Sequence, residues 1–135
     1  MFIPEIEKKS KQEIKEYQEG RLKETLSYLN SHSKYYQRLF TEHKIDIKNI
    51  VTLEALVQIP VTTKDHLQRY TDDFLCVEPK KIIDYVTTSG TMGDPVTFAM
   101  TDNDLNRLAY NEYISFSCAD TTNEDIFQLL VTLDK

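Results

Sequence analysis

The sequence has few cysteines and no long apolar run, which are the features of disulfide-linked, zinc-bound and membrane-spanning proteins. Its two cysteines, Cys76 and Cys118, lie far apart and outside any C-x-x-C pattern, which excludes a disulfide scaffold and a zinc finger. No apolar run approaches the roughly 18 residues of a membrane span, and residues 1–5 lack the apolar core of a signal peptide. We therefore expect a cytoplasmic protein that does not use the membrane as a partner.

Basic residues are scarce in the second part of the chain. Residues 1–50 hold ten Lys or Arg and eight Asp or Glu, whereas residues 51–135 hold six and fourteen. Affinity for a nucleic-acid backbone comes from basic residues that displace counterions, so a formal net charge of −6 argues against a nucleic-acid partner. A single nucleotide is still compatible with this charge, because a few backbone N–H groups can hold a phosphate.

The first third of the chain has the pattern of a helical hairpin or a bent helix. Leu22, Leu26 and Leu29 are spaced by four and three residues, which places them on one face of a helix over residues 12–30. Gly20 marks a point where this helix is expected to be weakened by about 1 kcal/mol or broken. Ser33 is predicted to cap a second short helix.

Shorter elements are expected further along. Thr62, followed three residues later by Asp65, predicts a capping box at the start of another short helix. The 135 residues suit one domain at most, with a hydrophobic share of 40% that is typical of a globular chain. Residues 1–81 are thus predicted to form a helical N-terminal segment.

From residue 82 the pattern changes to that of an α/β domain. Residues 82–88 and 96–100 are rich in β-branched and aromatic side chains and predict two strands joined by a loop. Thr101 is expected to cap a helix that reaches about residue 116. Residues 126–133 are apolar on both faces, as in a buried strand. We predict that 82–135 is a strand–loop–strand–helix–strand part of a larger sheet.

The last predicted strand has nothing in this sequence to cover its second face. We therefore expect the chain to be the N-terminal piece of a larger protein, and we expect the exposed strand to make this piece self-associate. The alternative is a small complete domain that ends on an edge strand.

Glycine is also rare, and two of the three glycines, Gly90 and Gly93, fall in the loop between the two predicted strands. Glycines let a backbone approach an anion with its N–H groups turned inward, and the neighbouring hydroxyl groups can donate further hydrogen bonds. The loop is not a Walker A loop, because Asp94 stands where that motif needs lysine, and it lacks the G-x-G-x-x-G fingerprint. A phosphate-binding loop and a tight hairpin turn both remain open from these residues alone.

A resemblance to a known enzyme family favours the phosphate-binding loop over the plain hairpin turn. Residues 87–96, TTSGTMGDPV, resemble the phosphate loop S/T-S-G-T-T-G-K-P of the adenylate-forming enzymes. Residues 24–40, 59–67 and 101–105 are similar, in the same order, to segments of the N-terminal part of phenylacetate–coenzyme A ligases; these include IPVTTKDHL, for the family's L-P-x-T-T-K-x-x-L, and TDNDL, for its T-x-x-D-L. The resemblance extends over nearly the whole chain from residue 22 onward.

The resemblance implies a chemistry. The family uses ATP and Mg²⁺ to convert a carboxylic acid, here of the aryl-acetate type, to an acyl adenylate and pyrophosphate, and coenzyme A then displaces AMP to give a thioester. The loop would orient the ATP phosphates and stabilise charge on the leaving pyrophosphate. The residues that would form this phosphate cradle are Thr88, Ser89, Gly90, Thr91 and Gly93.

Two positions depart from the family motif. Met92 removes a hydroxyl group, and Asp94 replaces a cation by an anion beside a polyphosphate. We expect Asp94 to weaken ATP binding unless it points away or faces Mg²⁺.

No catalytic residue maps onto this chain, because the family's adenine contacts, acyl pocket and catalytic lysine lie further along. The chain alone is therefore expected to be inactive. The alternatives are another adenylate-forming synthetase that stops at adenyl transfer, such as a deazaflavin-adenylating or capsule-biosynthesis enzyme, and a non-catalytic interaction module whose loop is a plain turn.

No metal site is predicted. His32, His43 and His66 lack the mutual spacing of metal ligands and are expected at the surface. Cys76 and Cys118 have partly apolar neighbours and are expected to be buried packing residues rather than nucleophiles.

Overall fold

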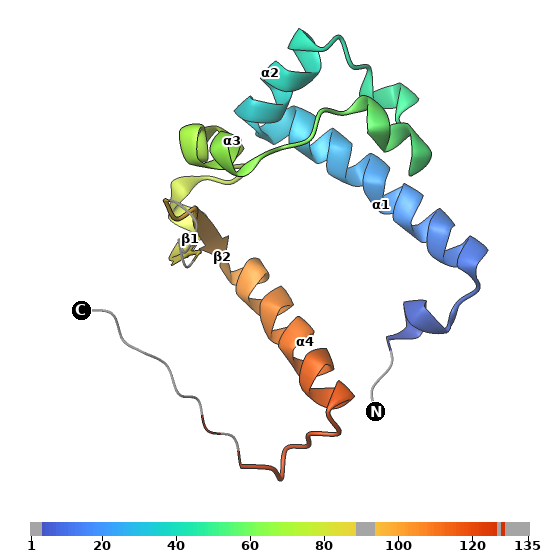
Figure 1. The fold of residues 1–135 in the computed structure, drawn as a ribbon, viewed down its shortest axis with the longest axis vertical. Helices are drawn as coiled ribbons and strands as arrows, with labels where there is room; N and C mark the ends of the chain where they lie inside the picture. The colour runs from blue at the N-terminus through green and yellow to red at the C-terminus, as the bar shows by residue number, and fades with distance from the viewer. Residues whose placement is uncertain (1–3, 89–93, 127, 129–135) are drawn as a thin grey trace.

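The structure is a computed structural model that describes residues 4–88, 94–126 and 128. Its long elements are α1 (Lys11–His32), α2 (Lys34–Glu42), α3 (Lys64–Arg69), β1 (Ile82–Thr87), β2 (Thr97–Thr101) and α4 (Asp102–Cys118). Among the described residues, the 3₁₀ helix η1 (Glu5–Lys8) precedes α1, and four more lie between the later elements: η2 (Ile47–Asn49), η3 (Glu54–Gln58), η4 (Thr71–Phe74) and η5 (Pro79–Lys81). Figure 1 shows a helical first part followed by a hairpin and a long helix, which confirms the predicted α/β class.

The first two helices meet at the single residue Ser33, where the sequence predicted a helical hairpin or a bent helix. α1 begins with a capping box, in which the Ser10 side chain accepts from the Glu13 backbone N–H and the Glu13 carboxylate reaches back to Ser10. α1 continues through Gly20 without a break, because one glycine costs only about 1 kcal/mol in an otherwise helical sequence. Ser33 then caps α2 as predicted, accepting from the Tyr36 N–H at 3.3 Å.

The hydrophobic core lies between these helices and the 3₁₀ turns that follow them. Its buried side chains are Leu26, Tyr35, Leu39, Phe40 and Ile50. The partly buried side chains packed around them are Leu22, Tyr36, Ile45, Ile47, Ala55, Ile59, Tyr70 and Phe74. The core thus joins one face of α1 and one face of α2 to the turns that follow them, as far along the chain as Tyr70 and Phe74.

Two polar contacts bind α2 to η4. The Ser33 hydroxyl, which is fully buried, donates to the Asp73 backbone oxygen at 3.0 Å. The Arg38 guanidinium pairs with the Asp73 carboxylate at 3.0 Å and lies 4.9 Å from the Tyr70 ring centroid. These contacts hold the chain that leads into the hairpin against the core.

The cap of α3 differs from the prediction by one residue. Thr63, not Thr62, is the N-cap, and its capping-box partner is His66 rather than Asp65. The Thr62 hydroxyl instead lies 3.0 Å from the Tyr36 hydroxyl of α2. Thr62 therefore makes a tertiary contact, and the next residue, Thr63, caps α3.

The two predicted strands are confirmed, and they pair with each other in an antiparallel hairpin. Tyr85 lies opposite Ala99 and Val86 lies opposite Phe98, with a bulge near the start of β1. β2 leads directly into α4, whose capping box joins Thr101 and Asp104 as expected from the Thr101 cap. Of the predicted third strand, 126–133, only residues 126 and 128 are described, and neither belongs to a strand; the rest lies outside the described residues.

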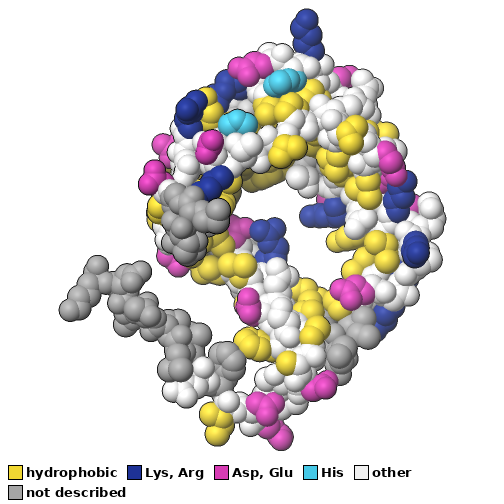
Figure 2. Space-filling model, in the orientation of Figure 1, with side chains coloured by type: hydrophobic (Ala, Val, Ile, Leu, Met, Phe, Trp, Pro, Cys, Tyr) yellow, Lys and Arg dark blue, Asp and Glu magenta, His cyan; other side chains and the backbone are white. Residues whose placement is uncertain are grey.

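The hairpin and α4 leave much apolar surface uncovered. Tyr85 is 62% exposed, Phe98 41% and Leu108 44%. Figure 2 shows an opening between α1 and α4, with hydrophobic side chains along its rim.

The two cysteines differ from the prediction. Cys118 is exposed and Cys76 is only half-buried, so the expectation that both are buried is wrong.

Through the part of the chain that the structure describes, no helix combines the length and the apolar character that crossing a bilayer requires.

Candidate functional site

The candidate phosphate loop is closed at its base by two hydrogen bonds. The Thr88 backbone N–H donates to the Val96 oxygen at 3.0 Å, and the Val96 N–H donates to the Thr88 hydroxyl oxygen at 3.0 Å. Val96 is only 4% exposed and anchors this base in the interior. The antiparallel ladder of β1 and β2 therefore continues one step beyond the strands and brings the two ends of the loop together.

Thr88 is the member of the predicted cradle that the structure places. Ser89, Gly90, Thr91 and Gly93 lie outside the described residues. The Thr88 side chain is exposed, and its oxygen accepts a hydrogen bond from the Val96 N–H; a hydroxyl group that accepts can also donate its own hydrogen. A hydroxyl donor at the base of the loop fits a phosphate ligand.

The downstream end of the loop is held from α3. The Gln68 side-chain amide donates to the backbone oxygen of Asp94, and the Asp94 side chain is exposed. Sequence reasoning missed Gln68, because 26 residues separate it from Asp94 and neither spacing nor motif connects them. α3 therefore contacts the loop base as well as the core.

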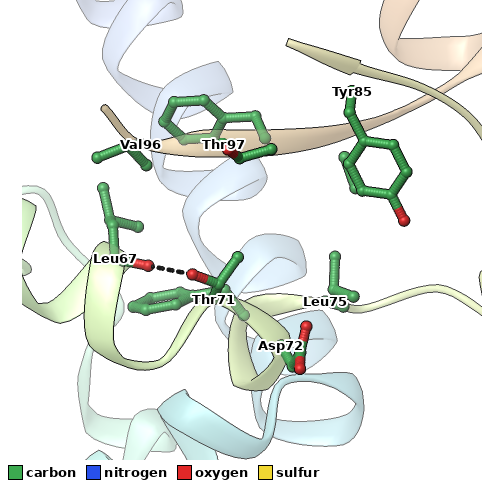
Figure 3. A pocket seen from close by; sticks show the side chains of 10 residues that line it. Leu67, Thr71, Asp72, Leu75, Tyr85, Val96 and Thr97 are labelled. Atoms are coloured by element: carbon green, nitrogen blue, oxygen red, sulfur yellow. Dashed lines mark hydrogen bonds between the residues drawn. The ribbon is translucent and has the colours of Figure 1, made fainter. Parts of the chain in front are cut away.

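A pocket of about 170 Å³ separates the hairpin from α3 and η4. Figure 3 shows Tyr85, Val96 and Thr97 from the hairpin facing Leu67 and Thr71 across it. None of the 10 described residues that line it is Lys, Arg or His, and its one charged group is the Asp72 carboxylate. This lining suits an apolar group and not a phosphate.

The pKa shifts of three groups near the hairpin and the core have clear physical causes. A backbone hydrogen bond from Thr101, helped by the Thr101 hydroxyl, lowers the pKa of the Asp104 carboxyl. Burial raises the pKa of the Cys76 thiol, so this cysteine is not activated as a nucleophile. Burial likewise raises the pKa of the Tyr35 hydroxyl.

In residues 4–88 and 94–126, His, Cys, Asp and Glu side chains form no group of three that could hold a metal ion. His66 is half-buried and bonded to Tyr35, which differs from the surface position expected for all three histidines.

The chain resembles known ligases in sequence. It is 34% identical over 110 residues to the phenylacetate-coenzyme A ligase of Thermus thermophilus, a match that covers 81% of this chain and 25% of that protein. It is 30% identical over 105 residues to the phenylacetate-coenzyme A ligase of Escherichia coli, with 77% and 24% covered. No model of a known protein family matches the chain.

The fold supports the same relationship. A crystal structure of 2-hydroxyisobutyryl-CoA ligase in complex with 2-HIB-AMP and CoA superposes with a TM-score of 0.68 at 26% identity, over 76% of this chain and 23% of that one. The matched residues therefore belong to the adenylate-forming ligases, in their phenylacetate–coenzyme A ligase-like branch. The chain spans about a quarter of the length of the curated relatives it matches.

Proposed function

We propose that this chain provides the phosphate-binding loop of an ATP-dependent acid–thiol ligase that adenylates an aryl-acetate-type carboxylic acid and transfers it to coenzyme A. The observation that carries the proposal is the hydrogen-bonded base at Thr88 and Val96, which holds the ends of the glycine- and hydroxyl-rich loop together. The proposal is also supported by the similarity of the chain to two proteins named phenylacetate-coenzyme A ligase.

In this proposal the loop acts by position and not by covalent chemistry. The hydroxyl groups and backbone amides of the cradle (Thr88, Ser89, Gly90, Thr91 and Gly93) orient the ATP phosphates and stabilise the charge on the departing pyrophosphate. Mg²⁺ supplies additional positive charge to the phosphates when bound. The helical segment 1–81 forms a supporting unit, and residues 82–135 begin the nucleotide-binding unit of a cytoplasmic enzyme.

A chimeric enzyme tests the proposal. The matching segment of the Thermus thermophilus ligase is replaced by this chain, and phenylacetate-dependent AMP formation is measured. We expect the chimera to retain activity and the double variant Gly90→Val/Gly93→Val to lose it. A folded chimera without activity, or a double variant as active as its parent, would contradict the proposal. The 135-residue chain alone is expected to release no pyrophosphate from ATP and phenylacetate.

Thr88 provides a finer test in the same chimera. Thr88→Val removes both the acceptor for the Val96 N–H and a donor to phosphate, so kcat/KM for ATP should fall about 10- to 100-fold, as expected for the loss of a hydrogen bond to a charged group. Thr88→Ser keeps the hydroxyl group and should stay close to the parent chimera. Equal activity of the valine and serine variants would show that the hydroxyl has no role.

The 135-residue chain is also expected to self-associate. Ile83, Tyr85 and Phe98 on the hairpin and Leu108 on α4 are more than 40% exposed, and exposed apolar strands tend to pair. Sedimentation should show an average mass that rises with concentration, whereas Phe98→Lys should lower it. A monomer over the whole concentration range would refute this expectation.

A further inference from the structure

The base of the candidate phosphate loop is held differently at its two ends. Upstream, Thr88 belongs to the hairpin itself and shares two hydrogen bonds of 3.0 Å with Val96. Downstream, Pro95 has no N–H group and cannot add a donor to the base. The Asp94 oxygen accepts instead from the side-chain amide of Gln68 on α3. The downstream end of the loop therefore depends on a side chain from the helical segment.

The backbone around Gln68 is fixed by a hydrogen bond from its own helix end. The Thr71 hydroxyl donates to the Leu67 oxygen at 2.9 Å and also lies 3.2 Å from the Gln68 oxygen, which closes the last turn of α3. Gln68 itself is half-buried, so part of its rotamer freedom is already lost before it bonds to Asp94. The amide donor is therefore preorganised on α3.

α3 is in turn attached to the hydrophobic core. It leads into η4, where Asp73 accepts from the buried Ser33 hydroxyl and pairs with Arg38, at 3.0 Å in both cases. On its other side, Figure 3 shows Leu67 of α3 facing Val96 of the hairpin across the pocket of about 170 Å³. Because this pocket separates the two elements, packing alone does not fix the distance between them. The Gln68 bond therefore transmits the position of the core to the loop base.

We propose that Gln68 is a positioning residue for the phosphate loop, an inference that rests on the function proposed above. Seven residues, 89–95, separate Thr88 from Val96. The bond at Asp94 reduces the interval between held residues to five, 89–93. A shorter interval between fixed ends has fewer conformations to lose when the loop closes on a ligand. Gln68 thus lowers the cost of bringing the loop amides onto the ATP phosphates.

Loss of this bond should weaken the use of ATP specifically. Gln68→Met keeps the length of the side chain but has no N–H donor. In the chimera with the Thermus thermophilus ligase we expect it to raise the KM for ATP about 3- to 10-fold, the range for one neutral hydrogen bond. The KM for phenylacetate should change less than about twofold, because the variant removes no group that binds the acid. A merely structural effect would lower the amount of folded enzyme and leave both KM values unchanged.

A measurement without turnover tests the bond itself in the 135-residue chain. Carbon-detected NMR is needed for the Asp94 carbonyl, because the next residue, Pro95, lacks the N–H group that proton-detected spectra require. Gln68→Met should shift the Asp94 carbonyl-carbon signal, and Gln12→Met should leave it unchanged. Gln12 is the matched control, since its amide also donates to one oxygen, at 2.8 Å on Glu16, but near the exposed start of α1.

The two readouts separate the role of Gln68 from the proposed function. An unchanged KM for ATP in the Gln68→Met chimera would overturn the inference, as would an equal rise in Gln12→Met or an Asp94 signal that does not move. Gln68→Glu keeps the shape and, when ionised, has no donor, so it should give the same result and serves if Gln68→Met does not fold. An inactive parent chimera would contradict the proposed function, whereas the Asp94 signal would still decide whether Gln68 holds the loop base.

Discussion

Replacing Ile50 by alanine should lower the free energy of unfolding by about 2–5 kcal/mol. The Ile50 side chain is 1% exposed and lies in the core beside Leu26, Leu39 and Phe40. The substitution removes buried methyl groups and leaves a cavity that the helices on either side cannot fill without moving. Urea unfolding monitored by circular dichroism measures the loss.

A graded series makes the Ile50 result specific. Ile50→Val removes one methylene group and should cost about 0.5–1.5 kcal/mol. Val57→Ala, at a side chain that is 88% exposed, should change stability by less than about 0.5 kcal/mol. If Ile50→Ala cost no more than Val57→Ala, residue 50 would not lie in a packed core and the described arrangement of α1, α2 and η2 would be wrong.

Replacing Ser33 by alanine should cost about 2–3 kcal/mol, although only one oxygen atom is lost. Its hydroxyl group caps α2 through the Tyr36 N–H and donates to the Asp73 oxygen, and the residue is fully buried. The loss of a helix cap contributes about 1 kcal/mol, and a backbone oxygen left without its partner adds about 1–2 kcal/mol. Urea unfolding measures this loss too.

Ser10 offers the matched control for Ser33. It also caps a helix, α1, but it is exposed, and the hydrogen bonds recorded for it, those of a capping box, are made with Glu13 of the same helix. Ser10→Ala should therefore cost about 1 kcal/mol, which is the capping contribution alone. A larger loss at Ser33 than at Ser10, which also gives up its side-chain bond to Glu13, would show that the buried bond to Asp73 stabilises the fold, and equal losses would contradict this.

Local signals in the sequence predicted most of the elements. The 4–3 leucine spacing of α1, the caps at Ser33 and Thr101, and the β-branched runs of the hairpin are all confirmed. Each depends on residues within a turn or two of one another, where steric and hydrogen-bonding preferences act directly. The continuity of α1 through Gly20 shows that one weak residue does not end a helix whose neighbours favour it.

Local sequence patterns could not predict the contacts between residues that are far apart in the sequence. The α3 cap moved from Thr62 to Thr63 because Thr62 contacts Tyr36, 26 residues away in the sequence. The bonds from His66 to Tyr35 and from Gln68 to Asp94 likewise connect segments that only the fold brings together. For the candidate site, the motif predicted the loop and its hydroxyl groups, whereas its support by α3 needed the structure.

The confinement of the core to residues 22–74 has a consequence for biosynthesis. Every side chain of that core has been translated before the hairpin and α4 are complete. Synthesis of the following 61 residues takes about 3–12 s at ordinary ribosomal rates, and small units fold within microseconds to seconds. The nascent chain can therefore close its first unit on the ribosome and offer a finished surface to the segments that emerge later.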